Sequence, residues 1–183
     1  MSPATPSRGR RRRLPGTEDE LADLALRYLE RFPTTAKRLG DFLRGKIQDA
    51  VAEGACDPVV ARPWVDAVVA RMIRARVLDD GQWAASRARV LHRRGRPRQV
   101  IARDLGSHGL ASGVVAEALA LLEEEEPEGD LAAAQALARR RRLGPWAPPE
   151  ERRAKRERHL AALARAGFSF DLARRVIDAA SGV

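Results

Sequence analysis

The sequence predicts an all-α protein built from three consecutive three-helix units, and three observations carry that prediction. Alanine and leucine dominate the 183 residues and aromatic side chains make up only 4%, so any core must be packed from small aliphatic side chains that favour helices. Apolar residues recur at intervals of three and four in segment after segment. A corner motif is also repeated along the chain, which is typical of repeat architectures.

The chain divides at Gly- and Pro-containing breaks into a tail and three repeats. Residues 1–16 are rich in Pro, Ser, Gly and Arg and have no periodicity, so we expect a disordered basic tail. The three-helix repeats are expected over residues 17–77, 78–126 and 127–183. The break between the last two is the clearest, because four glutamates, a proline and a glycine fall close together there.

The first repeat starts at a capping box, with Thr17 as the expected N-cap of a helix and Glu20 at its third position. A second helix is expected from about Thr35 to Glu53. A third follows two Pro-containing start signals. These signals are Asp57-Pro58 and Arg62-Pro63.

The other two repeats contribute three helices each, which brings the expected total to nine. Asp79 and Asp80 precede the second repeat's first helix and are interpreted as capping carboxylates. Its expected helices cover residues 82–92, 98–106 and 111–124. In the third repeat they cover residues 130–142, 150–166 and 169–180.

The repeated corner is clearest in the second and third repeats. In the second repeat, Asp104-Leu105 precedes Gly109-Leu110, and Gly109 lies four positions after Leu105. In the third repeat, Ala162-Leu163 precedes Gly167-Phe168 with the same spacing. Apolar residues then recur at identical offsets as far as Leu122 and Ala180. A chain that leaves a helix through a left-handed residue favours glycine there, so both glycines are expected to have positive φ.

The charge pattern points to a negatively charged partner. The formal net charge is +9, and seven arginines and no acidic residue lie between Gly81 and Arg103. An excess of this kind favours binding to a polyanion such as nucleic acid, or to an acidic protein surface. The alternative is a solvated basic surface with no binding role.

Several classes of function lack support in the sequence. The only cysteine, Cys56, allows no internal disulfide, and the three histidines are too scattered to form a metal site and are expected to be partly exposed. We find no catalytic constellation and no phosphate-binding loop, so we expect neither an enzyme nor a cofactor. No apolar run is long enough to span a membrane, and the cytoplasm is the default location.

Contact with nucleic acid, if it occurs, is expected at the phosphates. Three-helix units with a tight corner resemble helix-turn-helix modules, but arginine greatly outnumbers the neutral polar side chains that read bases near this corner. The few aromatic residues also give little support to a surface that stacks single-stranded bases.

Four short elements, in order, resemble the RecX family of regulatory proteins. The family shows a Leu-Asp-Asp-x-x-aromatic-Ala signature, an arginine run to a Gly-containing turn, a Leu-x-x-x-Gly-Ile/Leu corner and a C-terminal Gly-Phe-Ser element. In this chain they are Leu78 to Ala84, Arg87 to Pro97, Leu105 to Leu110, and Gly167-Phe168-Ser169.

This resemblance implies a fold and a function. The fold would be three tandem three-helix-bundle repeats forming an elongated, curved solenoid, and the protein would be a monomer. Proteins of this family bind the RecA recombinase filament on DNA and inhibit its strand-exchange, ATPase and coprotease activities. A positive strip along a solenoid suits such a polymer, which presents phosphates and acidic side chains along its length.

The candidate contact residues form two basic clusters, of which some members are expected to pair with Asp104 and Glu150. A protein that binds DNA non-specifically without RecA remains an alternative, as does a scaffold for some other acidic protein. The central cluster consists of Arg87, Arg89, Arg93, Arg94, Arg96, Arg98 and Arg103. The second cluster consists of Arg139, Arg140, Arg141, Arg142, Arg152, Arg153, Lys155 and Arg156.

Overall fold

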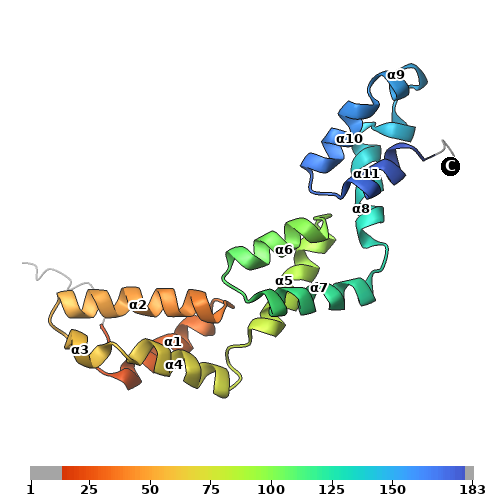
Figure 1. Ribbon diagram of the computed structural model, residues 1–183. Helices are drawn as coiled ribbons and strands as arrows, with labels where there is room; N and C mark the ends of the chain where they lie inside the picture. The colour runs from red at the N-terminus through yellow and green to blue at the C-terminus, as the bar shows by residue number, and fades with distance from the viewer. Residues whose placement is uncertain (1–13, 180–183) are drawn as a thin grey trace, which may run out of the picture. The chain divides into compact units, whose positions relative to one another are not determined.

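The computed structural model describes residues 14–179, and within them it contains eleven α-helices, one 3₁₀ helix and no strand (Figure 1). The all-helical prediction is therefore confirmed. The chain divides into two compact units, residues 1–79 and residues 80–183. Most of the expected basic tail falls on residues 1–13, which lie outside the described residues.

The last residues of the expected tail are part of the first unit. Pro15 is buried, and the backbone N–H of Gly16 donates to the carboxylate of Glu20 over 2.8 Å. The prediction of disorder is thus wrong for residues 14–16, because a carboxylate of the first helix holds the chain just before that helix.

Four helices make up the described part of the first unit, one more than the sequence predicted. The predicted cap at Thr17 is confirmed, because its hydroxyl accepts from the backbone N–H of Glu20. Thr35, where the second helix was expected to start, caps that helix in the same way. The additional helix is short and has its own cap, Asp57, which accepts from two backbone N–H groups. The helices are α1 (Glu18–Leu29), α2 (Ala36–Ala52), α3 (Pro58–Ala61) and α4 (Trp64–Arg74).

The core of this unit forms where α4 packs against both α1 and α2. Its fully buried members include Leu21, Leu39, Leu43 and Val68, of which Leu39 and Leu43 lie four residues apart on one face of α2. Leu78 also packs into this core, although it opens the sequence signature assigned to the second repeat.

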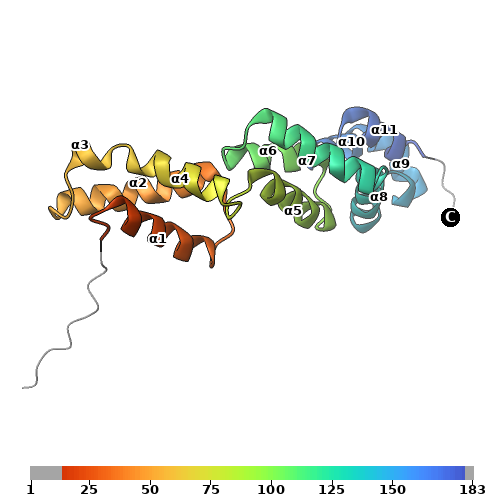
Figure 2. The ribbon, with the colours of Figure 1, turned by 90° about the horizontal axis from the view of Figure 1, so that it is seen from below.

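The second unit contains the remaining helices and two separate cores. In both views α5, α6 and α7 lie side by side and form one bundle, whereas the later helices gather around α8 (Figures 1 and 2). Its elements are α5 (Asp80–Arg93), α6 (Arg98–Ser107), α7 (Ser112–Glu125), α8 (Gly129–Arg141), η1 (Gly144–Trp146), α9 (Pro149–Ala154), α10 (Arg156–Arg165) and α11 (Phe170–Ile177).

The two cores of this unit are built around equivalent corners. Gly109 and Gly167 have φ angles of 78° and 98°, so the predicted left-handed conformation is confirmed at both. Leu105 and Leu163 occupy the same place before the corner, and both are completely buried. Ala180, which completes the second copy of the pattern, lies outside the described residues.

Contacts between the two bundles of this unit are close. The carboxylate of Asp130, on α8, accepts from the backbone N–H of Arg98 at the first position of α6. A negative charge at a helix N-terminus stabilises the helix. A Cβ added to Gly167 would collide with the side chain of Val100 on α6. These contacts hold the start of α6 against both α8 and the second corner.

Two sequence-based expectations are wrong in the second unit. The helix expected over residues 150–166 is divided into α9 and α10 at Lys155. The guanidinium of Arg152 donates to the carbonyls of Pro145 and Ala147, which fastens α9 to the preceding loop. His92 and His159, which were expected to be partly exposed, are buried at 8% and 5% exposure, since each packs where a helix meets another element.

Candidate partner-binding surface

Six of the fifteen candidate cations are held by other groups of the second unit. Both nitrogens of one edge of the Arg87 guanidinium donate to the Asp104 carboxylate over 2.9 and 3.0 Å, as predicted for Asp104. Glu150 was expected to pair with a cation of the second cluster, but its neighbour Glu151 does so instead. The distance between Oε1 of Glu151 and Nζ of Lys155 is 2.6 Å. The other four held cations are Arg89 with Glu125, Arg98 with Glu123 and Asp130, Arg152 with backbone carbonyls, and Arg156 with Asp178.

Two of the paired carboxylates have lowered pKa values. The Arg89 guanidinium holds the pKa of Glu125 below its ordinary range, and the Arg156 guanidinium does the same for Asp178. Hydrogen bonding to the charged form is the main cause in both cases. These carboxylates are therefore ionised at neutral pH, and each places a negative charge next to its arginine.

The other nine candidates are exposed and make no ion pair with any described residue. They are Arg93, Arg94, Arg96, Arg103, Arg139, Arg140, Arg141, Arg142 and Arg153. A surface guanidinium without a nearby carboxylate is free to bind an external anion. These nine are the candidate contacts that the structure leaves available.

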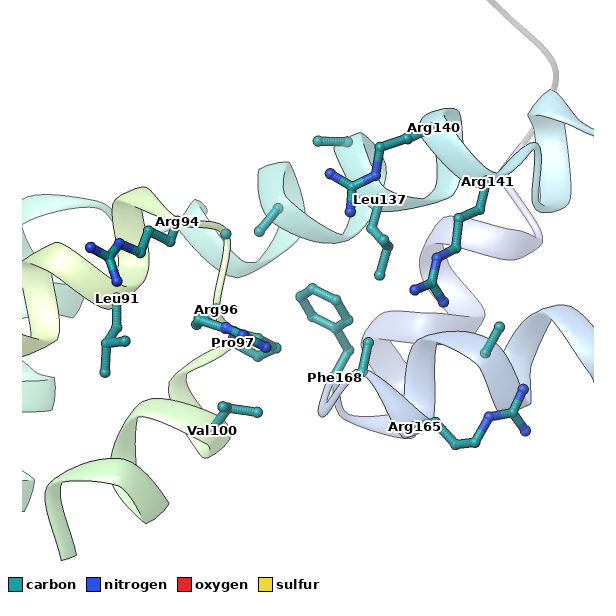
Figure 3. Close-up of a pocket in the computed structure, with 15 residues that line it drawn as sticks. Leu91, Arg94, Arg96, Pro97, Val100, Leu137, Arg140, Arg141, Arg165 and Phe168 are labelled. Carbon is teal, nitrogen blue, oxygen red and sulfur yellow. The ribbon is translucent and has the colours of Figure 1, made fainter. Parts of the chain in front are cut away.

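Four of the available arginines meet at one groove between the two bundles of the second unit. This central groove has a volume of about 830 Å³. Arg94 and Arg96 lie on its α5–α6 side, and Arg140 and Arg141 lie on its α8 side (Figure 3). Its remaining lining includes Arg165 and mainly small or aliphatic residues of α6, α8 and α10.

Local structure explains why arginines gather there. α5 ends at Arg93, Gly95 follows with a φ of 72°, and the backbone N–H of Arg96 donates back to the carbonyl of Leu91. This tight ending, followed at once by the buried Pro97 before α6, presents Arg94 and Arg96 from a short turn. The C-terminal turn of α8 presents the arginines opposite, where positive charge suits the helix dipole.

The end of α8 is also conformationally strained. Its C-cap, Arg142, has φ of 53° and ψ of 56°, a left-handed conformation that costs an ordinary L-residue roughly 1–2 kcal/mol. Glycine is the usual residue at such a position. An arginine placed there keeps an additional exposed charge beside the groove at the expense of stability.

A second groove continues the basic surface along α10. This adjacent groove has a volume of about 530 Å³ and shares Arg141, Ala162 and Arg165 with the central groove. Its lining also includes Arg142 and Arg158. The adjacent groove also contains the Glu151–Lys155 pair, and the two grooves together form a mainly basic surface from the end of α8 along α10.

Sequence reasoning missed two members of this surface, Arg158 and Arg165. Both are exposed and make no ion pair with residues 14–179. They lie seven residues apart on one helix, so they share a face with Ala162 between them. That spacing was readable from the sequence. Arg158 ends the charged run that begins at Lys155, but only the first two residues of that run were selected, and Arg165 stands among uncharged residues.

His159 supports the adjacent groove from within. Its Nδ1 accepts from the backbone N–H of Gly144 over 3.1 Å, so that nitrogen carries no proton. Burial lowers the pKa of His159 and thus favours the neutral ring. The ring therefore fixes the loop after α8 instead of adding positive charge to the surface.

The described residues contain neither a metal-ligand cluster nor a membrane-spanning helix. No group of three or more potential metal ligands comes together among residues 14–179. None of the helices in that range has the length and apolar character needed to cross a bilayer. The chain is thus an all-helical protein with consecutive small cores and a strongly basic, grooved surface.

Comparison with known proteins identifies the family, although no protein-family model matches the chain. Regulatory protein RecX of Myxococcus xanthus is 39% identical over 159 residues, which cover 86% of this chain and 84% of that protein. Regulatory protein RecX of Halorhodospira halophila is 31% identical over 162 residues, which cover 88% and 89% of the two chains. The chain belongs to the RecX family of regulatory proteins.

Solved structures agree with the fold. The crystal structure of RecX from Lactobacillus salivarius aligns with a TM-score of 0.68 at 20% identity, covering 87% of this chain and 94% of that one. A second crystal structure of regulatory protein RecX aligns with a TM-score of 0.65 at 21% identity, covering 88% of this chain and 72% of the other. The resemblance seen in the short sequence elements is confirmed at the level of the family.

Proposed function

We propose that this chain binds the RecA recombinase filament on DNA and inhibits its strand-exchange, ATPase and coprotease activities. The observation that carries the proposal is the 39% identity to a RecX regulatory protein over most of both chains. In this proposal the protein acts in the cytoplasm as a monomer, without a cofactor and without catalysing a reaction. Its working surface consists of the available arginines of the two clusters.

The basic surface gives the proposal a physical basis. A filament on DNA offers a dense array of negative charges, and arginines that lack internal partners are attracted to it. Such attraction weakens as salt is added, because the Debye length shortens and the release of each condensed counterion into a saltier solution gains less entropy. The proposal therefore includes a strong dependence on ionic strength.

The repeat organisation inferred from the sequence also forms part of this proposal. The three cores of the described chain are centred on residues 21–78, 84–122 and 134–177. The last two ranges lie within the proposed repeats over residues 78–126 and 127–183, and the first extends one residue beyond the repeat over residues 17–77. Small cores that succeed one another along the chain are typical of repeat proteins, which bind partners over extended surfaces.

A titration into RecA filaments tests the function. The protein is added in steps to RecA on single-stranded DNA while the rate of ATP hydrolysis is followed. The proposal predicts that ATPase activity falls progressively as the protein is added, at concentrations up to about that of RecA. An unchanged rate at every ratio would contradict it.

The second candidate function is non-specific DNA binding without RecA, and the exposed arginines favour it as well. It predicts tight binding to bare DNA, a steep loss of affinity with added salt and no effect specific to RecA. Pull-downs with RecA filaments, RecA alone and DNA alone separate the two candidates. Retention by DNA alone, together with an unchanged RecA ATPase rate, would favour this second function.

A further inference from the structure

The central groove combines positive charge with an apolar floor. Its charged lining residues are all arginines, and no Asp or Glu contributes to it. Val100 and Leu137, together with alanines of α8 and α10, form the floor and remain partly exposed. Figure 3 shows the Phe168 ring between Pro97 and Leu137 at the centre of this floor.

The arginines around the floor have no internal compensation. Arg94, Arg96, Arg140, Arg141 and Arg165 are exposed, and none forms an ion pair with a residue of the described range. Five like charges around one groove repel one another, so an anionic occupant gains from all of them. Arginines elsewhere in the same unit are neutralised by acids brought from distant sequence positions.

The floor distinguishes between classes of anion. Covering partly exposed aliphatic side chains with an apolar group removes their surface from water and favours binding. A phosphate backbone offers no such group. Bases would need an open aromatic face for stacking, and the one aromatic residue of the groove, Phe168, is only 4% exposed.

This chain's own segments do not suit the groove. Residues 1–13 contain five arginines and no acidic residue, so their charge is of the wrong sign. In the glutamate run of residues 123–126, Glu123 and Glu125 already pair with Arg98 and Arg89. The charge of the groove is thus complementary to a segment of another molecule.

We infer that the central groove is a docking site for an acidic protein segment in which apolar side chains are flanked by Asp or Glu. The apolar side chains lie on the Val100–Leu137 floor, and the carboxylates pair with arginines on both sides. Arginine suits this role because its planar guanidinium binds a carboxylate through two hydrogen bonds. The inference goes beyond the proposed function, since it concerns a protein contact made without DNA.

A peptide-binding experiment with the full chain tests the inference. The probe is a fluorescein-labelled peptide of alternating Glu-Glu and Leu-Leu pairs, and binding is followed by fluorescence anisotropy at two salt concentrations. A control peptide has every leucine replaced by serine and so keeps its charge. We expect the leucine peptide to bind about tenfold more tightly than the serine peptide, which corresponds to about 1.4 kcal/mol.

Charge-reversal variants locate the binding. The pair Arg140→Glu and Arg165→Glu changes two exposed, unpaired arginines of the groove and should weaken binding about tenfold or more. The control pair, Arg38→Glu and Arg174→Glu, makes the same change in net charge at exposed positions that line neither groove. Far-UV circular dichroism checks that both variants are folded, and the control is expected to bind as the unchanged protein does.

Three outcomes would overturn the inference. Equal affinity for the leucine and serine peptides would show that the floor takes no part. Equal weakening by the two variants would show that net charge alone attracts the peptide. Displacement of the peptide by a charge-matched single-stranded oligonucleotide, with the groove variant losing oligonucleotide affinity to the same extent, would assign the groove to nucleic acid. RecA is absent from this experiment, so its result is distinguishable from that of the ATPase titration.

Discussion

The arginines of the α5–α7 bundle differ from those at the central groove, although the sequence presents both as runs of positive charge. Arg87 and Arg89 face carboxylates on α6 and α7, and both pairs are bidentate. Arg94 and Arg96, only a few residues later, have no acidic partner within the described chain. The first two therefore hold helices together, whereas the last two are available to a partner.

This difference shows that tertiary contacts, more than local charge density, decide whether an arginine is available to a partner. Asp104 and Glu125 lie 17 and 36 residues from the arginines they neutralise. The groove arginines sit in a helix-ending turn and at the C-terminal end of α8, beyond the reach of those acids. Charge reversal should consequently affect binding at one place and stability at the other.

The largest expected effect is a loss of RecA inhibition when the groove is reversed in charge. The triple variant Arg94→Glu, Arg96→Glu and Arg140→Glu replaces attraction by repulsion at three exposed contacts. We expect the concentration needed for half-maximal ATPase inhibition to rise by at least about tenfold. The urea midpoint of unfolding should stay nearly unchanged, and inhibition at the original concentration would argue against a role for the groove.

The next effect is on stability, and it concerns a paired arginine. Arg87→Ala leaves the Asp104 carboxylate, which is 26% exposed, without its bidentate partner. The free energy of unfolding should fall by about 1–3 kcal/mol. The double variant with Asp104→Ala should recover part of that loss, as measured by urea denaturation. RecA inhibition by the single variant should persist at temperatures where it is folded.

A smaller and opposite effect is expected at the strained end of α8. Arg142→Gly removes the left-handed strain and should raise the free energy of unfolding by about 1 kcal/mol. Arg139→Gly is the matched control, because glycine within a helix should lower it by about 1 kcal/mol. Inhibition should weaken in both variants, since each loses one exposed charge. A destabilised Arg142→Gly would contradict the assignment of strain.

The smallest effect concerns pH and the buried His159. Because burial lowers its pKa in the folded state, the unfolded chain takes up a proton that the folded chain resists as the pH falls below about 6.5. Stability should therefore decrease from pH 6.5 downward until the lowered folded pKa is passed. His159→Asn should reduce this slope in urea titrations at several pH values. An unchanged slope would show that other groups account for it.

Much of the fold was predictable because its signals are local. Thr17 caps the first helix as predicted, the second helix starts next to Thr35 as expected, and Gly109 and Gly167 have the left-handed conformation that the repeated corner requires. Helical periodicity located most helices to within a few residues. The division at Lys155 was not predictable, because the contacts of Arg152 and His159 with the preceding loop involve tertiary structure.

The site was predictable only in outline. The two basic clusters contain four of the five groove arginines, but they also contain Arg87 and Arg156, whose partners lie far along the chain. Arg165 was missed because it stands alone in the sequence and meets the others only in space. Local sequence reveals where charge accumulates, and long-range pairing decides how much of it remains available.

Arginine footprinting would test this distinction most directly. The protein is treated with phenylglyoxal alone and with saturating RecA filaments on single-stranded DNA, and modification of each arginine is quantified by mass spectrometry. We predict that Arg94, Arg96, Arg140, Arg141 and Arg165 react readily alone and are protected by the filament, whereas Arg87 and Arg89 react slowly in both states. Groove arginines that stay equally reactive when the filament is bound would contradict the account.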